Sequence, residues 1–194
     1  FMDFITSLLT EWGYLALFII MALENMNIPI PSEIVLGFAG FLVFKGVFAF
    51  WPTILIGTAA GLTGSLLSYW MGYKGGRKIL LKFSTKGGLT TKKLIAADSW
   101  FQNFGGLAVF TGRLLPGIRT FISLPAGIAQ YNLRKFILFS IAGTVPWTML
   151  LVYIGSALGE NWETLLLYKV EIAAGAFLFV GMMIIIYLFF RKQK

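Results

Sequence analysis

The sequence predicts an all-α integral membrane protein, built as an inverted repeat with two opposed re-entrant helical hairpins and about four transmembrane helices. Three observations support this prediction. Of the 194 residues, 58% are hydrophobic and 12% are charged, with a mean hydropathy of +0.82, whereas a soluble domain is about 25% charged. Two apolar segments are interrupted by proline, glycine and charge, and short motifs recur in the same order in the two halves.

The residue types that the chain lacks restrict its chemistry. It has no cysteine and no histidine, which excludes disulfides, thiolate chemistry, histidine general bases and histidine-ligated metals. We therefore expect no cofactor and no metal. The net charge of +8 would suit nucleic acid, but the basic residues flank apolar runs as they do in cytoplasmic loops. We interpret them as a topology signal and expect no nucleic-acid partner.

Four apolar stretches have about the 20 residues that cross the core of a bilayer. They are residues 8–24, which follow an interfacial start with Glu11 and Trp12, and residues 53–73, 136–158 and 172–190. Two further apolar segments, 25–50 and 105–130, contain prolines, glycines and charges. Neither makes a good straight helix, because proline removes a backbone hydrogen bond and clashes with the preceding turn.

Lysine and arginine indicate which loops are cytoplasmic, since short loops rich in these residues stay inside. The basic stretch 74–93 and the C-terminal RKQK are therefore expected inside, as is the turn at Arg134 and Lys135. The loop 159–171 carries three glutamates and is expected outside. Both termini then lie in the cytoplasm.

This topology determines how the two interrupted segments meet the membrane. Both ends of residues 105–130 fall on the cytoplasmic side, and both ends of residues 25–50 fall on the outer side. A segment that enters and leaves by one face is re-entrant, so the two segments are predicted to be hairpins that dip in from opposite faces.

An internal repeat supports this symmetry. Each half has a proline, a charge, an AG pair, a GT pair that opens a span, and an LLxY motif, with spacings that agree within two residues. The first half has Pro31, Glu33, Ala39-Gly40, Gly57-Thr58 and LLSY; the second has Pro116, Arg119, Ala126-Gly127, Gly143-Thr144 and LLVY. With opposite topology, this is the inverted-repeat plan of transporters, in which broken helices meet near the midplane.

The matched positions carry opposite charges, Glu33 and Arg119, and each has a companion, Glu24 and Arg113. A charge at the bilayer centre costs about 2.5–3.5 kcal/mol on insertion scales, so four would cost roughly 10–14 kcal/mol. They must therefore pair, face a water-filled cavity, or lie shallower than the midplane.

Two interpretations of this cluster remain open. In the structural one, Ser32 caps a helix that begins at Glu33, and the arginines neutralise the acids and tie the hairpins together. In the functional one, Arg113 and Arg119 receive an anionic head group, because a guanidinium donates two parallel hydrogen bonds to phosphate. Glu24 and Glu33 would then exchange protons or compete for the same arginines.

The predicted organisation is a single membrane domain, residues 1–194. It comprises a first repeat at about 8–73, an interfacial amphipathic linker at 74–104, a second repeat at about 105–158 and a C-terminal transmembrane helix at 172–190. The linker interleaves apolar residues with lysines, which suits the surface of an anionic membrane. A plain cytoplasmic loop is the alternative interpretation of this linker.

Three motifs carry a resemblance to a known family: ENMNIPIPSE from Glu24, FTGRLLPGIRTFISLPAGIA from Phe110, and GTVPW from Gly143. Across nearly the whole chain, the sequence resembles the DedA family of bacterial inner-membrane proteins, which is related to eukaryotic lipid scramblases. The resemblance implies paired re-entrant hairpins, a multi-pass protein of the bacterial cytoplasmic membrane, and lipid transport.

The resemblance also implies site residues. The essential acids of the family fall on Glu24 and Glu33, and its essential arginines fall on Arg113 and Arg119. The supporting motif positions are Pro29, Pro31, Ser32, Gly112, Pro116, Gly117, Thr120 and Gly127. Many members have Gly-Asp after the second proline and a longer gap between the acids, whereas this chain has Ser32-Glu33 nine residues after Glu24.

We expect the protein to be a flippase that moves an anionic lipid phosphate across the membrane. Undecaprenyl phosphate is the favoured substrate, and the proton gradient is a candidate driving force. Its expected partners are that lipid, the surrounding membrane lipids and protons. The sequence leaves the oligomeric state open, with a homodimer as one option. The alternatives are a flippase or scramblase for phosphatidylethanolamine or another phospholipid, and a proton-coupled antiporter for small cations. An enzyme such as a phosphatase is disfavoured, because no pair of nucleophile and base stands out.

Overall fold

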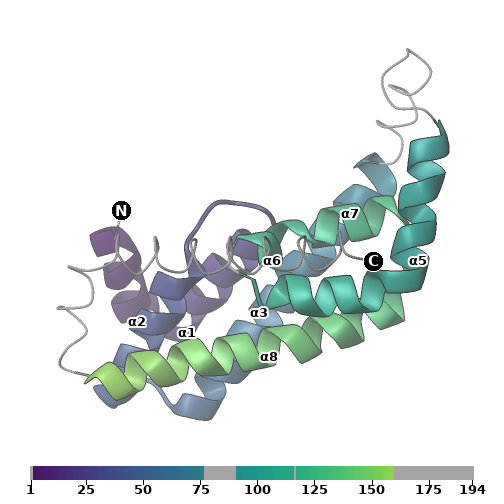
Figure 1. The fold of residues 1–194 in the computed structure, drawn as a ribbon. Coiled ribbons are helices and arrows are strands. Elements are labelled where there is room, and N and C mark those ends of the chain that lie inside the picture. The colour runs from purple at the N-terminus through teal and green to yellow at the C-terminus, as the bar shows by residue number, and fades with distance from the viewer. Residues whose placement is uncertain (1, 77–90, 116, 160–194) are drawn as a thin grey trace. The chain divides into compact units, whose positions relative to one another are not determined.

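The computed structural model describes residues 2–76, 91–115 and 117–159. The chain divides into two units, Phe1–Ala157 and Leu158–Lys194, and the described residues lie almost entirely in the first. Every regular element in the described ranges is a helix (Figure 1). The helices are α1 (Met2–Asn25), α2 (Ser32–Phe44), α3 (Phe50–Met71), the π-helix η1 (Gly72–Gly76), α5 (Thr91–Arg113), α6 (Ile118–Phe121), α7 (Ser123–Ile128) and α8 (Leu133–Leu158).

Three of these segments are long and apolar enough to cross a membrane. They are Ile5–Asn25, Phe50–Gly76 and Leu133–Leu158, of 21, 27 and 26 residues. At a rise of about 1.5 Å per residue, each spans the roughly 30 Å of a bilayer core. They contain the predicted spans 8–24, 53–73 and 136–158, so the protein is a multi-pass membrane protein. The fourth predicted span, 172–190, lies outside the described residues.

The first interrupted segment breaks where the prolines predict. After α1 the chain makes a turn at Asn27 (φ 73°), runs without regular structure through Pro29, and enters α2. α2 has 13 residues, about 20 Å of helix, which is too short to cross a bilayer. One detail of the prediction was wrong. Pro31, not Ser32, is the N-cap of α2, and no side chain caps the helix.

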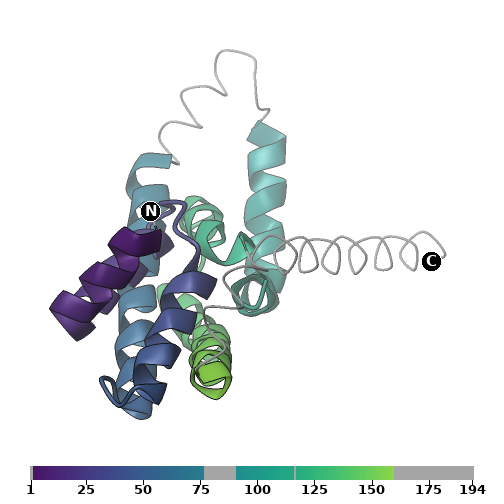
Figure 2. The same cartoon turned by 90° about the vertical axis from the view of Figure 1, so that its left-hand side faces the viewer.

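The second interrupted segment breaks into shorter pieces. α5 ends at Arg113, and Gly117, in a left-handed conformation (φ 75°), leads into α6 and α7, of four and six residues. Glycine adopts this conformation readily because it has no Cβ. α5 runs unbroken through residue 105, so the predicted boundary between linker and second repeat falls inside a helix. Figures 1 and 2 show α5 bent, with its first part running across the direction of α8 and its last part running along it.

Glycines bring the short helices against the spanning helices. Gly40 of α2 lies on the backbone of α8 at Val152, and Gly127 of α7 lies on the backbone of α3 at Tyr69. A Cβ at either glycine would overlap a carbonyl oxygen of the facing helix. Small residues allow such close approach, the main source of helix association in lipid. Each glycine of the repeated AG pair therefore contacts the spanning helix of the other half.

We predict that Gly127→Ala lowers the free energy of unfolding by about 1–3 kcal/mol, because the new methyl group must displace the Tyr69 backbone. Thermal unfolding in detergent measures this effect. Gly75→Ala is the matched control, since a Cβ there meets nothing within 4 Å. Equal melting temperatures for the two variants would contradict the proposed contact.

Candidate functional site

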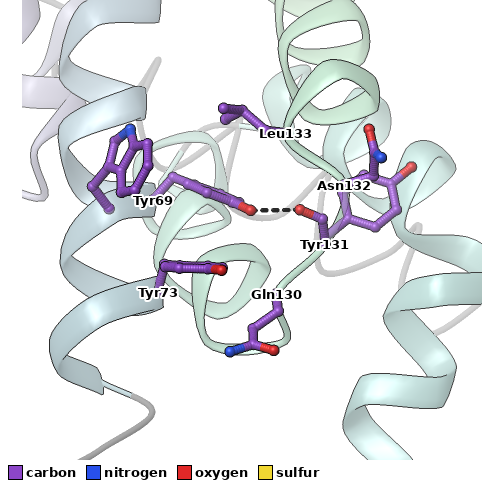
Figure 3. A pocket seen from close by; sticks show the side chains of 7 residues that line it. Tyr69, Tyr73, Gln130, Tyr131, Asn132 and Leu133 are labelled. Atoms are coloured by element: carbon purple, nitrogen blue, oxygen red, sulfur yellow. Dashed lines mark hydrogen bonds between the residues drawn. The ribbon is translucent and has the colours of Figure 1, made fainter.

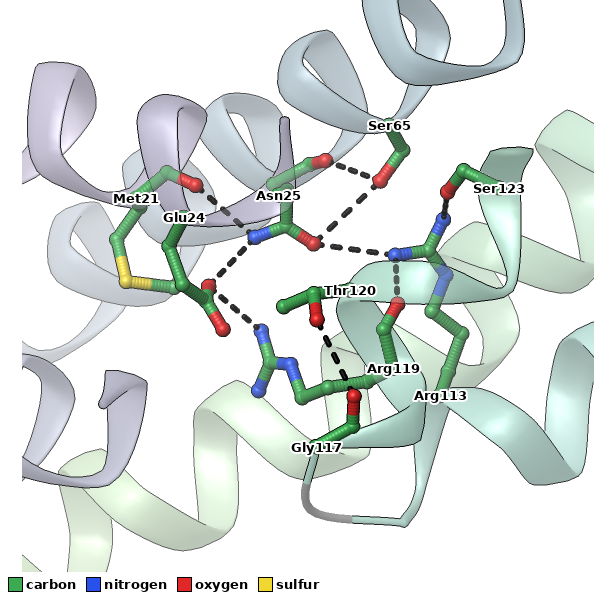
Figure 4. A network of polar contacts seen from close by, with 10 residues as sticks. Met21, Glu24, Asn25, Ser65, Arg113, Gly117, Arg119, Thr120 and Ser123 are labelled. Atoms are coloured by element: carbon green, nitrogen blue, oxygen red, sulfur yellow. Dashed lines mark hydrogen bonds and ion pairs between the residues drawn. The ribbon is translucent and has the colours of Figure 1, made fainter. Parts of the chain in front are cut away.

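A cluster of buried polar side chains lies where α1 ends and where α5 gives way to α6 (Figure 4). We call it the polar centre and define it by Glu24, Asn25, Arg113 and Arg119. Their side chains are 2%, 0%, 1% and 2% exposed, respectively. The structure thus brings together three of the four predicted charged residues, from segments about 90 positions apart.

Arg119 and Glu24 form the ion pair of the polar centre. Arg119 Nη2 lies 3.6 Å from Glu24 Oε2, and Asn25 Nδ2 donates to the same oxygen at 2.7 Å. Arg119 is otherwise weakly held: its Nε and Nη1 are buried without a hydrogen-bond partner among the described residues. Its guanidinium lies 5.6 Å from the centre of the Trp147 ring. A buried guanidinium with unpaired N–H groups can still bind an anion.

Arg113 is held quite differently. Its Nη1 donates to Asn25 Oδ1 at 3.1 Å and to the backbone carbonyl of Arg119 at 2.8 Å. Its Nη2 donates to Ser123 Oγ at 2.8 Å and to Ser140 Oγ at 3.4 Å. Arg113 therefore ties its own helix, α5, to α1, α6, α7 and α8.

Glu33 lies apart from this network. It is half-buried in the first turn of α2 and close enough to Glu24 for their charges to repel. It forms no ion pair with another described residue. Arg119, at the matched position of the repeat, pairs with Glu24. Two guanidiniums thus face one carboxylate inside the polar centre, which leaves one positive charge unmatched there.

The motif residues of the first half approach the polar centre from the extended segment. Pro29 and Pro31 are exposed in the segment that leads to α2. Ser32, 1% exposed, interacts with the Glu24 carboxylate.

The motif residues of the second half shape the turn between α5 and α6. Gly112 faces Ile122, so that the end of α5 packs closely on the following turn. Thr120 Oγ1 donates to the carbonyl of Gly117 at 3.2 Å. Gly127 makes the contact with α3 described above, and Pro116 lies outside the described residues.

Sequence reasoning missed two asparagines of the same motif. Asn25 bridges Glu24 and Arg113, and Ser65 Oγ of α3 approaches its side-chain oxygen at 3.5 Å. Asn27 Nδ2 donates to the carbonyl of Thr120 at 3.1 Å, while Ser68 Oγ donates to Asn27 Oδ1. The signal was present in ENMN, where two amides stand beside an acid in an apolar chain.

A separate cavity of about 270 Å³ lies between the end of α3 and the turn before α8 (Figure 3). Tyr69 donates from its hydroxyl to the carbonyl of Tyr131 at 2.5 Å across it. Its lining residues are Tyr69, Trp70, Tyr73, Gln130, Tyr131, Asn132 and Leu133. None of these was a predicted site residue. In the described part of the chain, no group of three or more His, Cys, Asp or Glu residues could hold a metal ion.

Helical spans around a buried arginine–glutamate centre define the class: a multi-pass membrane protein with an ionic site inside its helical bundle. The model of the VTT domain matches residues 30–157, and the chain therefore belongs to the VTT-domain family, also known as the DedA family. This confirms the resemblance seen in its motifs. No solved structure matches the chain.

Individual relatives cover most of the chain. An uncharacterized membrane protein, YkoX, of Bacillus subtilis is 36% identical over 94% of this chain and 80% of its own length. Undecaprenyl phosphate transporter A of the same organism is 33% identical over 96% of this chain and 91% of its own length. An alkaline phosphatase-like protein of Lactococcus lactis is 32% identical over 83% of this chain and 78% of its own length.

We predict that Asn25→Ala lowers the free energy of unfolding by about 2–3 kcal/mol, because the buried Arg113 Nη1 loses one acceptor and Glu24 loses one donor. Chemical or thermal unfolding in detergent measures the loss. Asn103→Ala, at an exposed position of α5, is the matched control and should be close to neutral. A neutral Asn25→Ala would show that the amide does not hold the polar centre together.

Proposed function

We propose that this protein is a membrane lipid transporter that moves a lipid phosphate head group through the polar centre while the lipid tail stays in the bilayer. One observation carries the proposal: Arg119 is buried, bears one ion pair at 3.6 Å, and keeps two nitrogens without a partner. A phosphate group supplies both the acceptor oxygens and the negative charge that these groups lack.

The two arginines then have different roles. Arg113 is committed to four acceptors and serves as the positioning residue that fixes α6 and α7. Arg119 binds the head group, and Glu24 is the counter-ion that the phosphate displaces. Protonation of the displaced Glu24 would spare a buried negative charge beside the phosphate, which gives a route for coupling to the proton gradient. Glu33, half-buried beside Glu24, is the second acid available to such a proton.

The architecture that fits this mechanism is an inverted repeat, residues 8–73 and 105–158, whose interrupted segments are re-entrant hairpins. The paired contacts of Gly40 and Gly127, each with a spanning helix of the other half, support it. The shortness of α2, α6 and α7 supports it as well. Irregular backbone at membrane depth is tolerated where it is buried in protein or lines a polar cavity.

Undecaprenyl phosphate is the lipid that we propose first, because relatives in Bacillus subtilis and Staphylococcus aureus are named undecaprenyl phosphate transporter A. The proposed direction is from the outer to the inner leaflet of the bacterial cytoplasmic membrane, with both termini in the cytoplasm. The name of the Lactococcus lactis relative raises hydrolysis as an alternative, which inorganic phosphate released from the lipid would reveal.

We predict that Arg119→Lys reduces head-group translocation about tenfold or more in reconstituted vesicles, because an ammonium keeps the charge but loses the planar fork. Its thermal stability should stay close to wild type. Arg113→Lys should lower both transport and the unfolding temperature, since it breaks several hydrogen bonds at once. Arg134→Lys, at an exposed position, is the control. Normal transport by Arg119→Lys would refute the mechanism.

We predict that Glu24→Gln binds dodecyl phosphate at least as tightly as wild type but translocates it more slowly, because the competing carboxylate and its proton are gone. Binding in detergent and transport in vesicles measure the two effects separately, with exposed Glu11→Gln as control. A cation antiporter makes the opposite prediction: no phosphate binding in either protein, and cation transport abolished by Glu24→Gln.

A further inference from the structure

The indole of Trp147 presents a polar group that the fold leaves unused. Trp147 lies in the middle of α8, directly after Pro146. Its Nε1 is buried and has no hydrogen-bond partner among the described residues. An indole nitrogen is a donor only, and a buried donor without an acceptor destabilises the fold. Such an N–H group is available to an acceptor from outside the chain.

The surroundings of Trp147 indicate where this acceptor binds. The Arg119 guanidinium lies 5.6 Å from the Trp147 ring centre, and two of its nitrogens, Nε and Nη1, are also buried without a partner. The guanidinium of α6 and the indole of α8 are therefore neighbours, and each carries N–H groups without a partner. No carboxylate of the described chain satisfies them, since Glu24 contacts Arg119 through Nη2.

The other arginine provides an internal comparison. Arg113 also lies over an aromatic ring of α8, that of Phe136, at 5.8 Å. A phenylalanine ring is thus sufficient to stack on a buried guanidinium in this fold. Arg113 donates through both η nitrogens to protein acceptors, leaves only Nε without a partner, and lies over a ring without a donor. Arg119 leaves both Nε and Nη1 without a partner and lies over a ring that carries a donor.

We propose that Trp147 is a specificity-determining ligand that makes the site select a phosphate monoester over a phosphate diester. The inference rests on the proposed function and names its substrate class. A monoester has three unesterified oxygens. Two can accept from one edge of the Arg119 guanidinium once the phosphate has displaced Glu24 from Nη2, and the third can accept from the indole N–H. A diester has two, which that edge of Arg119 occupies alone. Because the indole carries no charge, it adds a directional hydrogen-bond donor to the site without adding positive charge.

The test compares two ligands with the same tail, dodecyl phosphate and dodecyl methyl phosphate, bound to the purified full-length chain in detergent. At pH 5 both carry about one negative charge, so charge does not favour the monoester. Trp147→Phe keeps the ring and removes the donor. We expect it to weaken monoester binding about tenfold, the usual effect of losing one hydrogen bond to a charged group. Diester binding should stay within about twofold of wild type, by the same reasoning.

Two controls separate this inference from the proposed function. Trp12→Phe alters an indole that is 57% exposed and should leave both affinities unchanged. Arg119→Lys should weaken both ligands. If Trp147→Phe binds both ligands like wild type while Arg119→Lys loses them, the role of Trp147 is refuted and the proposed function stands. If Arg119→Lys also binds normally, the proposed function fails with it.

A measurement on the wild-type protein covers the case in which Trp147→Phe does not fold. The indole ¹⁵N–¹H resonance of Trp147 should shift when dodecyl phosphate is added and remain in place with dodecyl methyl phosphate. If this resonance shifts with neither ligand at saturating concentration, the proposal is overturned. Inorganic phosphate identifies the source of the group: displacement of dodecyl phosphate at similar concentrations indicates free phosphate, and failure to displace it indicates a lipid-borne monoester.

Discussion

The ion pair between Glu24 and Arg119 is buried among the helices, and its burial governs how the chain must fold around it. Charges in this setting are costly unless they are paired and hydrogen-bonded. The fold supplies the two buried arginines with different numbers of partners. Arg113 reaches four protein acceptors, whereas Arg119 has one contact at 3.6 Å and two nitrogens without a partner. In the mechanism that we propose, this difference separates the positioning arginine from the one that exchanges its counter-ion.

The broken helices follow from the same constraint. Arg113 and Arg119 can converge only if the chain turns between them, which the left-handed Gly117 and the four-residue α6 allow. The first half turns in a comparable way at Asn27, which returns a hydrogen bond to the carbonyl of Thr120. The carbonyls of Arg119 and Thr120 at the second break thus accept hydrogen bonds from the side chains of Arg113 and Asn27, as irregular backbone at membrane depth requires. Close glycine contacts then hold the short helices on the spanning ones.

Much of this arrangement could be predicted from the sequence. Length and hydropathy located three spans, and proline and glycine located both breaks, because these signals are local. Convergence of Glu24, Arg113 and Arg119 followed from the cost of burying unpaired charges. The pairing itself was not predictable: the repeat aligned Glu33 with Arg119, but the direction of a side chain after a break depends on φ and ψ at Asn27 and Gly117. The bridging contacts of Asn25 were missed because they depend on tertiary neighbours.

Binding of phosphate by Arg119 can be tested by a ¹⁵N–³¹P dipolar measurement in solid-state NMR. The protein is labelled at the arginine side-chain nitrogens and reconstituted with a lipid phosphate monoester. We predict a coupling that corresponds to about 4 Å or less, as in a charge-assisted hydrogen bond. It should vanish in Arg119→Lys and persist in Arg134→Lys. A coupling that survives Arg119→Lys, or none in the wild-type protein, would contradict the claim that Arg119 binds the phosphate.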